Sequence, residues 1–77
     1  MNNPALILYH TEHCHLCEQA AEMLTGANIA FTHVDICEDN DLAERYGITI
    51  PVLQRLDTKQ ELGWPFDLSQ IHAFLGV

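Results

Sequence analysis

The segment that decides the fold is ALILYHTEHCHLC, which runs from Ala5 to Cys17. Residues 5–9 form a continuous apolar run, as is typical of a buried central strand. A polar loop follows, and the motif Cys14-His15-Leu16-Cys17 then opens a segment with helical periodicity. This order predicts a strand, a loop and a helix whose first turn holds two cysteines.

The position of these cysteines gives them different chemistry. At a helix N-terminus, unpaired N–H groups and the positive end of the helix dipole favour the thiolate of Cys14 over its thiol. Cys17 lies three residues further on, so it comes round to the same side of the helix one turn deeper. Cys14 can therefore attack a disulfide, and Cys17 can resolve the mixed disulfide that results. Because C-x-x-C also ligates zinc, it is the strand-loop-helix context that favours a redox site.

Length and composition bound the class of protein. The chain has 77 residues, which predicts a single domain over residues 1–77. Eleven acidic and three basic side chains give a net charge of −8, which disfavours nucleic acid as a partner. Residues 1–4 lack the features of a signal peptide and the longest apolar run has five residues, so we expect no contact with a membrane. We expect a monomer in the reducing cytoplasm, where a close cysteine pair is more often catalytic or metal-bound than structural.

Periodicity and turn residues predict the remaining elements. Gly26 is expected to end the first helix in a left-handed conformation, and Asp67 with Gln70 forms a capping pair for the last helix. The expected buried face of that last helix consists of Leu68, Ile71, Phe74 and Leu75. The expected strands cover residues 5–9, 29–34, 51–56 and 60–64, and the expected helices cover residues 14–25, 38–46 and 67–75.

The elements follow one another in the order β-α-β-α-β-β-α, which belongs to the α/β class. A helix joins the first two strands, so they should lie parallel with a right-handed crossover. The last two strands form a hairpin around residues 57–59. Placing this hairpin antiparallel beside the first strand gives a four-stranded mixed sheet in the order 2-1-3-4. The third strand then begins where the first one ends, so Ile50 and Pro51 should lie next to Cys14.

Several motifs in this order resemble a known family. A strand, C-x-x-C, a helix and a third strand opened by Thr49-Ile50-Pro51 resemble the thioredoxin fold and, at this length, a glutaredoxin. The chain is similar to the small glutaredoxin-like domains of bacteria through motifs that span nearly its whole length. These motifs are Tyr9-His10-Thr11, Cys14-His15-Leu16-Cys17, Arg45-Tyr46-Gly47, Ile50-Pro51-Val52-Leu53 and Trp64-Pro65-Phe66-Asp67.

The resemblance implies a thiol-disulfide oxidoreductase with the thioredoxin fold. It implies a cis peptide before Pro51 and a substrate groove shaped by Thr49, Ile50 and Pro51. In this groove the backbone of Ile50 pairs with an extended segment of the substrate. The implied partner is a disulfide-containing protein or a small-molecule thiol, with no resident cofactor and with glutathione as a candidate co-substrate.

The surroundings of the cysteines depart from those of glutathione-dependent glutaredoxins. Such proteins usually carry a basic residue near the C-x-x-C motif and a Gly-Gly then Asp region before the last helix. This chain has Glu12, His13 and Glu18 around the cysteines, and Gly63-Trp64-Pro65-Phe66-Asp67 in the later position. The residues that usually bind the carboxylates of glutathione are therefore missing, and we expect glutathione to bind weakly.

The remaining candidate residues leave other roles open. His13 and His15 are predicted to stabilise the reactive thiolate when they are protonated, whereas His10 is expected to be solvated. Cys37 is expected to be a half-buried structural thiol or, alternatively, a regulatory third thiol. We assign no metal ligands, although the cysteine pair and a histidine could hold zinc or copper(I). A non-catalytic interaction module that keeps the fold is the other alternative.

Overall fold

The computed structural model describes residues 5–76. Its strands are β1 (Leu6–His10), β2 (Thr32–Asp35), β3 (Val52–Arg55) and β4 (Glu61–Gly63). Its α-helices are α1 (His15–Gly26), α2 (Asn40–Tyr46) and α3 (Leu68–Leu75), and a short 3₁₀-helix, η1 (Ile36–Glu38), lies between β2 and α2. The predicted order of strands and α-helices is confirmed. Among the described residues, no helix has the length and apolar character that a membrane span requires.

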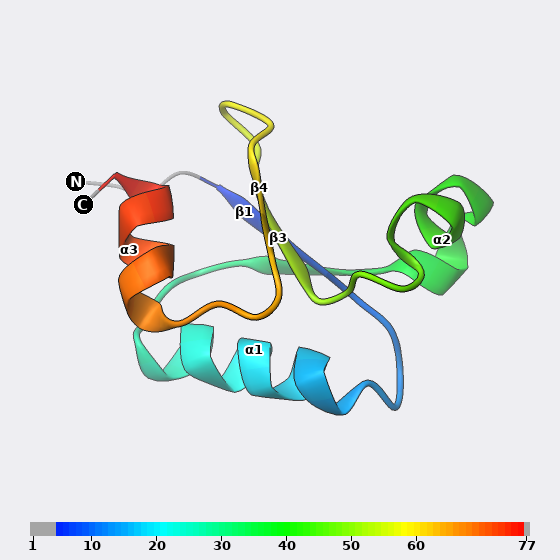
Figure 1. Ribbon diagram of the computed structural model, residues 1–77, viewed down its shortest axis with the longest axis horizontal. Helices are drawn as coiled ribbons and strands as arrows, with labels where there is room; N and C mark the ends of the chain where they lie inside the picture. The colour runs from blue at the N-terminus through cyan, green and yellow to red at the C-terminus, as the bar shows by residue number, and fades with distance from the viewer. Residues whose placement is uncertain (1–4, 77) are drawn as a thin grey trace.

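The sheet has the predicted strand order, β2-β1-β3-β4 (Figure 1). β1 pairs parallel with β2, with Leu8 opposite His33, and antiparallel with β3, with Leu8 opposite Leu53. β3 and β4 form the antiparallel hairpin. The parallel pair follows from the helix that joins β1 to β2, because a parallel connection must cross from one end of the sheet to the other.

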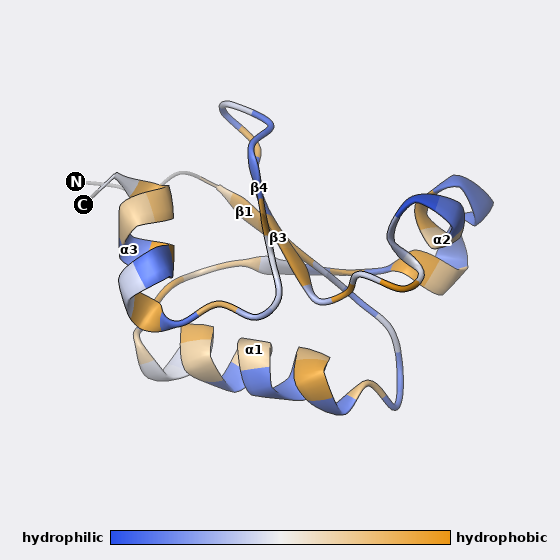
Figure 2. Ribbon diagram, in the orientation of Figure 1, coloured by the Kyte–Doolittle hydropathy of each residue, from blue (hydrophilic) through white to orange (hydrophobic). Residues whose placement is uncertain are grey.

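Alternation along β1 divides the core between the two faces of the sheet. Leu8 is completely buried in a cluster that includes Leu24 of α1 and Ile71 of α3. The next residue, Tyr9, instead packs in a second cluster with Tyr46 of α2, and the two rings stack with centroids 4.4 Å apart. Helices α1 and α3 therefore cover one face, and α2 covers part of the other. Figure 2 shows the matching pattern on α1, whose hydrophobic and hydrophilic residues occupy opposite sides.

Helix α3 begins with the predicted capping box. The Asp67 carboxylate accepts from the Gln70 amide at 2.8 Å, and the Gln70 side chain accepts from the Asp67 amide at 2.9 Å. Ile71 and Leu75 are buried, but Leu68 is 40% exposed, so its predicted place on the buried face is wrong. The buried stripe of this eight-residue helix is formed by two residues four positions apart, and Leu68 lies in the turn before them.

The connection from α1 to β2 differs from the prediction. Gly26 is the last residue of the helix and is not left-handed; Asn28 takes that conformation, with φ of 59°. Asparagine tolerates it because its short polar side chain can bond locally. The strand predicted over residues 29–34 begins at Thr32, because the amide of Ile29 still donates to a helical carbonyl at 3.0 Å. Ile29 thus packs into the core without pairing with β1.

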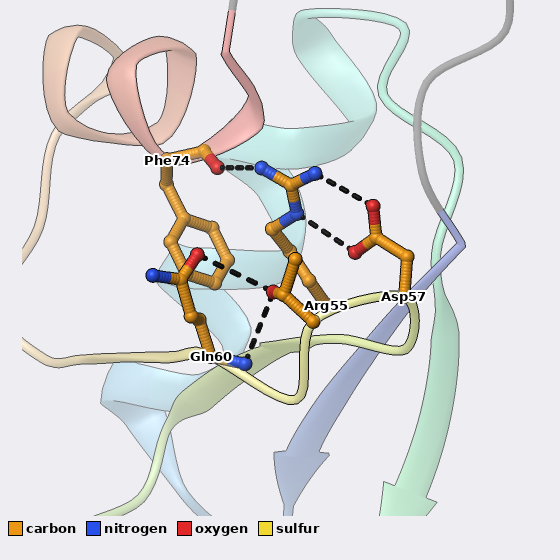
Figure 3. Close-up of polar contacts among 5 residues, drawn as sticks. Arg55, Asp57, Gln60 and Phe74 are labelled. Atoms are coloured by element: carbon orange, nitrogen blue, oxygen red, sulfur yellow. Dashed lines mark hydrogen bonds and ion pairs between the residues drawn. The ribbon is translucent and has the colours of Figure 1, made fainter.

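Arg55 connects the hairpin to the end of α3 (Figure 3). Its guanidinium donates to both carboxylate oxygens of Asp57, at 2.9 and 2.7 Å, and to the carbonyl oxygen of Phe74 at 2.7 Å. Because carbonyls in the last turn of a helix lack intrahelical partners, the contact with Phe74 satisfies one of them. The hydrogen bonds between the two side chains raise the pKa of Arg55 and lower the pKa of Asp57. The charge of Arg55 is therefore engaged away from the cysteine loop.

Candidate active site

The cysteine pair lies in the first turn of α1. Cys14 is the N-cap residue: its carbonyl accepts from the Glu18 amide at 3.1 Å, and its sulfur accepts from the Cys17 amide at 3.2 Å. The two sulfurs form a disulfide, with the Cα atoms 5.2 Å apart. Cys14 is half-buried, whereas Cys17 is only 4% exposed. A reagent in solution therefore reaches the sulfur of Cys14 more readily than that of Cys17.

A cavity of about 500 Å³ opens beside the disulfide. Its wall contains both cysteines and residues of β1, of the loop that follows β1, of α1 and of β2. The other wall residues are His10, Thr11, Glu12, His13, Glu18, Ala21 and His33. Of the two predicted helper histidines, the structure brings His13 to this wall but leaves the His15 side chain 82% exposed. The His15 ring lies 3.6 Å from the Glu18 carboxylate.

His33 is a wall residue that the sequence does not point out. Its ring meets that of His10 edge-on, with centroids 4.9 Å apart, and that of Phe31 at 4.8 Å. His33 is an exposed residue, but partial desolvation of its ring and the neighbouring His10 lower its pKa, which favours its neutral form. His10 was expected to be solvated, but it is half-buried because this ring packs against it. The parallel pairing of the first two strands is predictable, but the register that brings His33 here is not.

The three residues predicted to shape a substrate groove precede β3. Because β3 runs antiparallel to β1, they lie at the end of the sheet where the cysteine loop begins. The peptide between Ile50 and Pro51 is cis, as the resemblance implies, and Pro51 is completely buried. The Thr49 hydroxyl and the Ile50 amide both donate to the carbonyl of Tyr46 at 3.2 Å. The Ile50 amide is therefore engaged within the loop. These residues do not line the cavity, and their contact with substrate stays a prediction.

Cys37 is exposed, so the expectation that it is half-buried is wrong. It lies in η1, which projects beyond the end of β2, and its amide donates to the Asp35 carboxylate at 2.9 Å. Its sulfur is 3.1 Å from the hydroxyl oxygen of Thr11, a residue of the cavity wall. The third thiol is therefore near the active-site loop and accessible to solvent.

The alternative hypothesis, that the cysteine pair and a histidine hold zinc or copper(I), gains no support from this arrangement. Within residues 5–76, no three or more His, Cys, Asp or Glu side chains are grouped so that they could hold a metal ion. In the disulfide state, Cys14 and Cys17 are bonded to each other, and the thiolate form is the one that binds metal.

The fold and the site together define a thioredoxin-fold domain with a C-x-x-C pair at the start of its first helix. A family model described as Glutaredoxin-like domain (DUF836) matches residues 5–76. The chain belongs to this family. A comparison with curated proteins finds no significant match.

Solved structures from two bacteria share the fold closely. The X-ray structure of target protein XcR50 from X. campestris is 43% identical to this chain, with a TM-score of 0.84 over 92% of this chain and 95% of that one. The solution structure of protein Ne2328 from Nitrosomonas europaea is 26% identical, with a TM-score of 0.83 over 97% and 94% of the two chains. Thioredoxin 1 from Thermosipho africanus, at 14% identity and a TM-score of 0.62, covers 94% of this chain and 90% of its own. That last likeness shows the thioredoxin fold alone.

Proposed function

We propose that this protein is a thiol-disulfide oxidoreductase in which Cys14 is the nucleophile and Cys17 is the resolving thiol. The observation that carries the proposal is the difference between the two sulfurs within one helical turn. The sulfur of Cys14 is half-buried at the N-cap and accepts a hydrogen bond from the Cys17 amide, whereas Cys17 is buried. The hydrogen bond and the helix N-terminus both favour a thiolate at Cys14, and partial exposure lets a substrate reach it.

In the reducing direction, the reaction has two displacements. The Cys14 thiolate attacks one sulfur of the substrate disulfide, which forms a mixed disulfide and expels the other half of the substrate as a thiolate. Cys17 then gives up its proton and attacks the Cys14 sulfur, which releases the second half of the substrate and leaves the disulfide between Cys14 and Cys17. The released thiolates take up protons according to their pKa values. Two electrons pass from the protein to the substrate, and an external thiol or dithiol reductant restores the reduced protein.

The surrounding residues receive roles in this proposal. Residues 49–51 would bind the extended segment of a disulfide-containing protein, or the backbone of a small thiol. His13 and His15 would stabilise the Cys14 thiolate when protonated, and His13 is the one that lines the cavity. The protein would act as a cytoplasmic monomer without a resident cofactor, a nucleic acid or a membrane. Glutathione would be at best a weakly bound co-substrate.

Single-turnover exchange tests the proposal. The reduced protein is mixed with 2-hydroxyethyl disulfide, a small neutral substrate, and the products are weighed after acid quenching. Wild-type protein and Cys37→Ser should form the disulfide between Cys14 and Cys17, and Cys14→Ser should react far more slowly. Exchange by the wild type no faster than that of free cysteine would contradict the proposal and favour an interaction module without catalysis.

A further inference from the structure

The charges around the disulfide cavity all have one sign when the histidines are neutral. Glu12 and Glu18 line the cavity, one from the loop before the cysteines and one from the first turn of α1. Both residues are exposed, and the Glu18 carboxylate lies 3.6 Å from the ring of His15, a residue outside the wall. The lining includes neither lysine nor arginine.

The three basic residues of the chain lie elsewhere. Arg45 is on α2, with its guanidinium carbon 6.0 Å from the centre of the Tyr46 ring. Arg55 is held by Asp57 and the end of α3, and Lys59 lies in the turn between β3 and β4. None of them is a wall residue that could offset the two carboxylates.

Besides the cysteines and the two glutamates, the ionisable side chains of the wall are histidines, which carry no negative charge. His10, His13 and His33 contribute to the wall, and the pKa of His33 is lowered by partial desolvation and by His10. When these histidines are neutral, the cavity holds two carboxylates, and reduction of the disulfide adds the negative charge of the Cys14 thiolate.

We infer that this site selects disulfides that carry positive charge next to the sulfur-sulfur bond. The inference rests on the proposed function and adds a substrate class to it: groups with an ammonium or guanidinium within a few bonds of the sulfur. Glu12 and Glu18 attract the cationic group into the cavity while a substrate sulfur approaches Cys14. The cavity volume of about 500 Å³ is large enough for a group of side-chain size. The same charges repel anionic disulfides, including oxidised glutathione.

Three small disulfides of different charge test the selection. Cystamine is cationic, 2-hydroxyethyl disulfide is neutral and oxidised glutathione is anionic. Because their leaving thiols differ in pKa, each rate with reduced protein is divided by the rate of the same disulfide with dithiothreitol. At low ionic strength, the normalised rate should be on the order of tenfold higher for cystamine than for the neutral probe. In about 1 M salt, where the screening length is roughly 3 Å, most of this preference should disappear.

Matched charge variants locate the effect. Glu12→Gln and Glu18→Gln should each reduce the cationic preference roughly threefold. Glu22→Gln makes the same change in net charge on an exposed residue of α1 outside the cavity wall, so its effect should be smaller. A lysine-flanked peptide disulfide, compared with its serine-flanked counterpart, shows whether the preference extends to polypeptides.

The results separate the inference from the proposed function. Fast exchange with the neutral probe but equal normalised rates for all three charges would overturn the charge selection and leave the oxidoreductase proposal standing. An equal effect of Glu22→Gln and Glu18→Gln would overturn the role of the cavity carboxylates, because net charge alone would then explain the preference. Failure to exchange with any probe would overturn the proposed function and this inference together.

Discussion

Replacing Cys17 with serine should turn a transient mixed disulfide into a long-lived adduct on Cys14. In the wild type, the resolving sulfur is held one helical turn from the nucleophile, with the two Cα atoms 5.2 Å apart. A tethered group at short range acts at an effective concentration of at least ~1 mM. If free thiol is kept near ~10 µM, the adduct in Cys17→Ser should therefore survive at least ~100-fold longer than in the wild type.

The assay for this prediction is rapid acid quenching followed by intact mass and peptide mapping. Reduced Cys17→Ser is mixed with one equivalent of 2-hydroxyethyl disulfide, and the mass of the adduct is followed until it decays. Cys37→Ser is the matched control, because it removes an exposed thiol and should resolve like the wild type. An adduct that decays at the wild-type rate would refute the role of Cys17, as would an adduct mapped to another cysteine.

Three further predictions concern the packing of α3, the pKa of His33 and the reaction with glutathione. Ile71 is completely buried, so Ile71→Ala should lower the free energy of unfolding by about 2–5 kcal/mol in denaturant titrations. Leu68 is 40% exposed, so Leu68→Ala should lower it by less than half as much. The pKa of His33 in the folded state is lowered from 6.5. The neutral form of His33 therefore contributes to the free energy of unfolding above pH 6.5, and this contribution is lost as the pH falls through the folded-state pKa. As the pH falls, His33→Gln should therefore lose less unfolding free energy than the wild type. Parallel profiles of unfolding free energy against pH for the two proteins would contradict this prediction. In oxidised glutathione buffers, mass spectrometry should find mainly the disulfide between Cys14 and Cys17, because the neighbouring thiol expels attached glutathione; a dominant adduct would count against this.

Much of the fold is predictable because local signals agree with the connection rules. The apolar run before the cysteines indicates a central strand, and a helix that returns the chain to a second strand requires a parallel pair. The turn at residues 57–59 and the cap at Asp67 locate the last hairpin and the last helix. The arrangement of strands that these signals and connection rules predict has the strand order that is observed.

The details that were not predictable depend on register and on packing at element ends. His33 reaches the cavity because β2 pairs with β1 in one register, and the sequence does not specify that register. Cys37 is exposed while the preceding residue of η1, Ile36, is buried in the second cluster, and no periodic pattern signals which residue of this short helix is buried. Leu68 has a hydrophobic side chain at helical spacing, yet it lies in the first turn of α3 and remains partly exposed.

The different roles that we propose for the two cysteines follow from their positions on α1. Cys17, Ala20 and Leu24 are the buried residues of this helix, and their spacing of three and four residues places them on one face. Cys17 therefore belongs to the same buried stripe that packs the helix against the sheet. Cys14 precedes the first helical residue and is only half-buried, and its sulfur accepts the amide hydrogen bond that a capping side chain normally accepts. One structural requirement, a capped helix packed on a central strand, would thus supply both the accessible nucleophile and the protected resolving thiol of the proposed reaction.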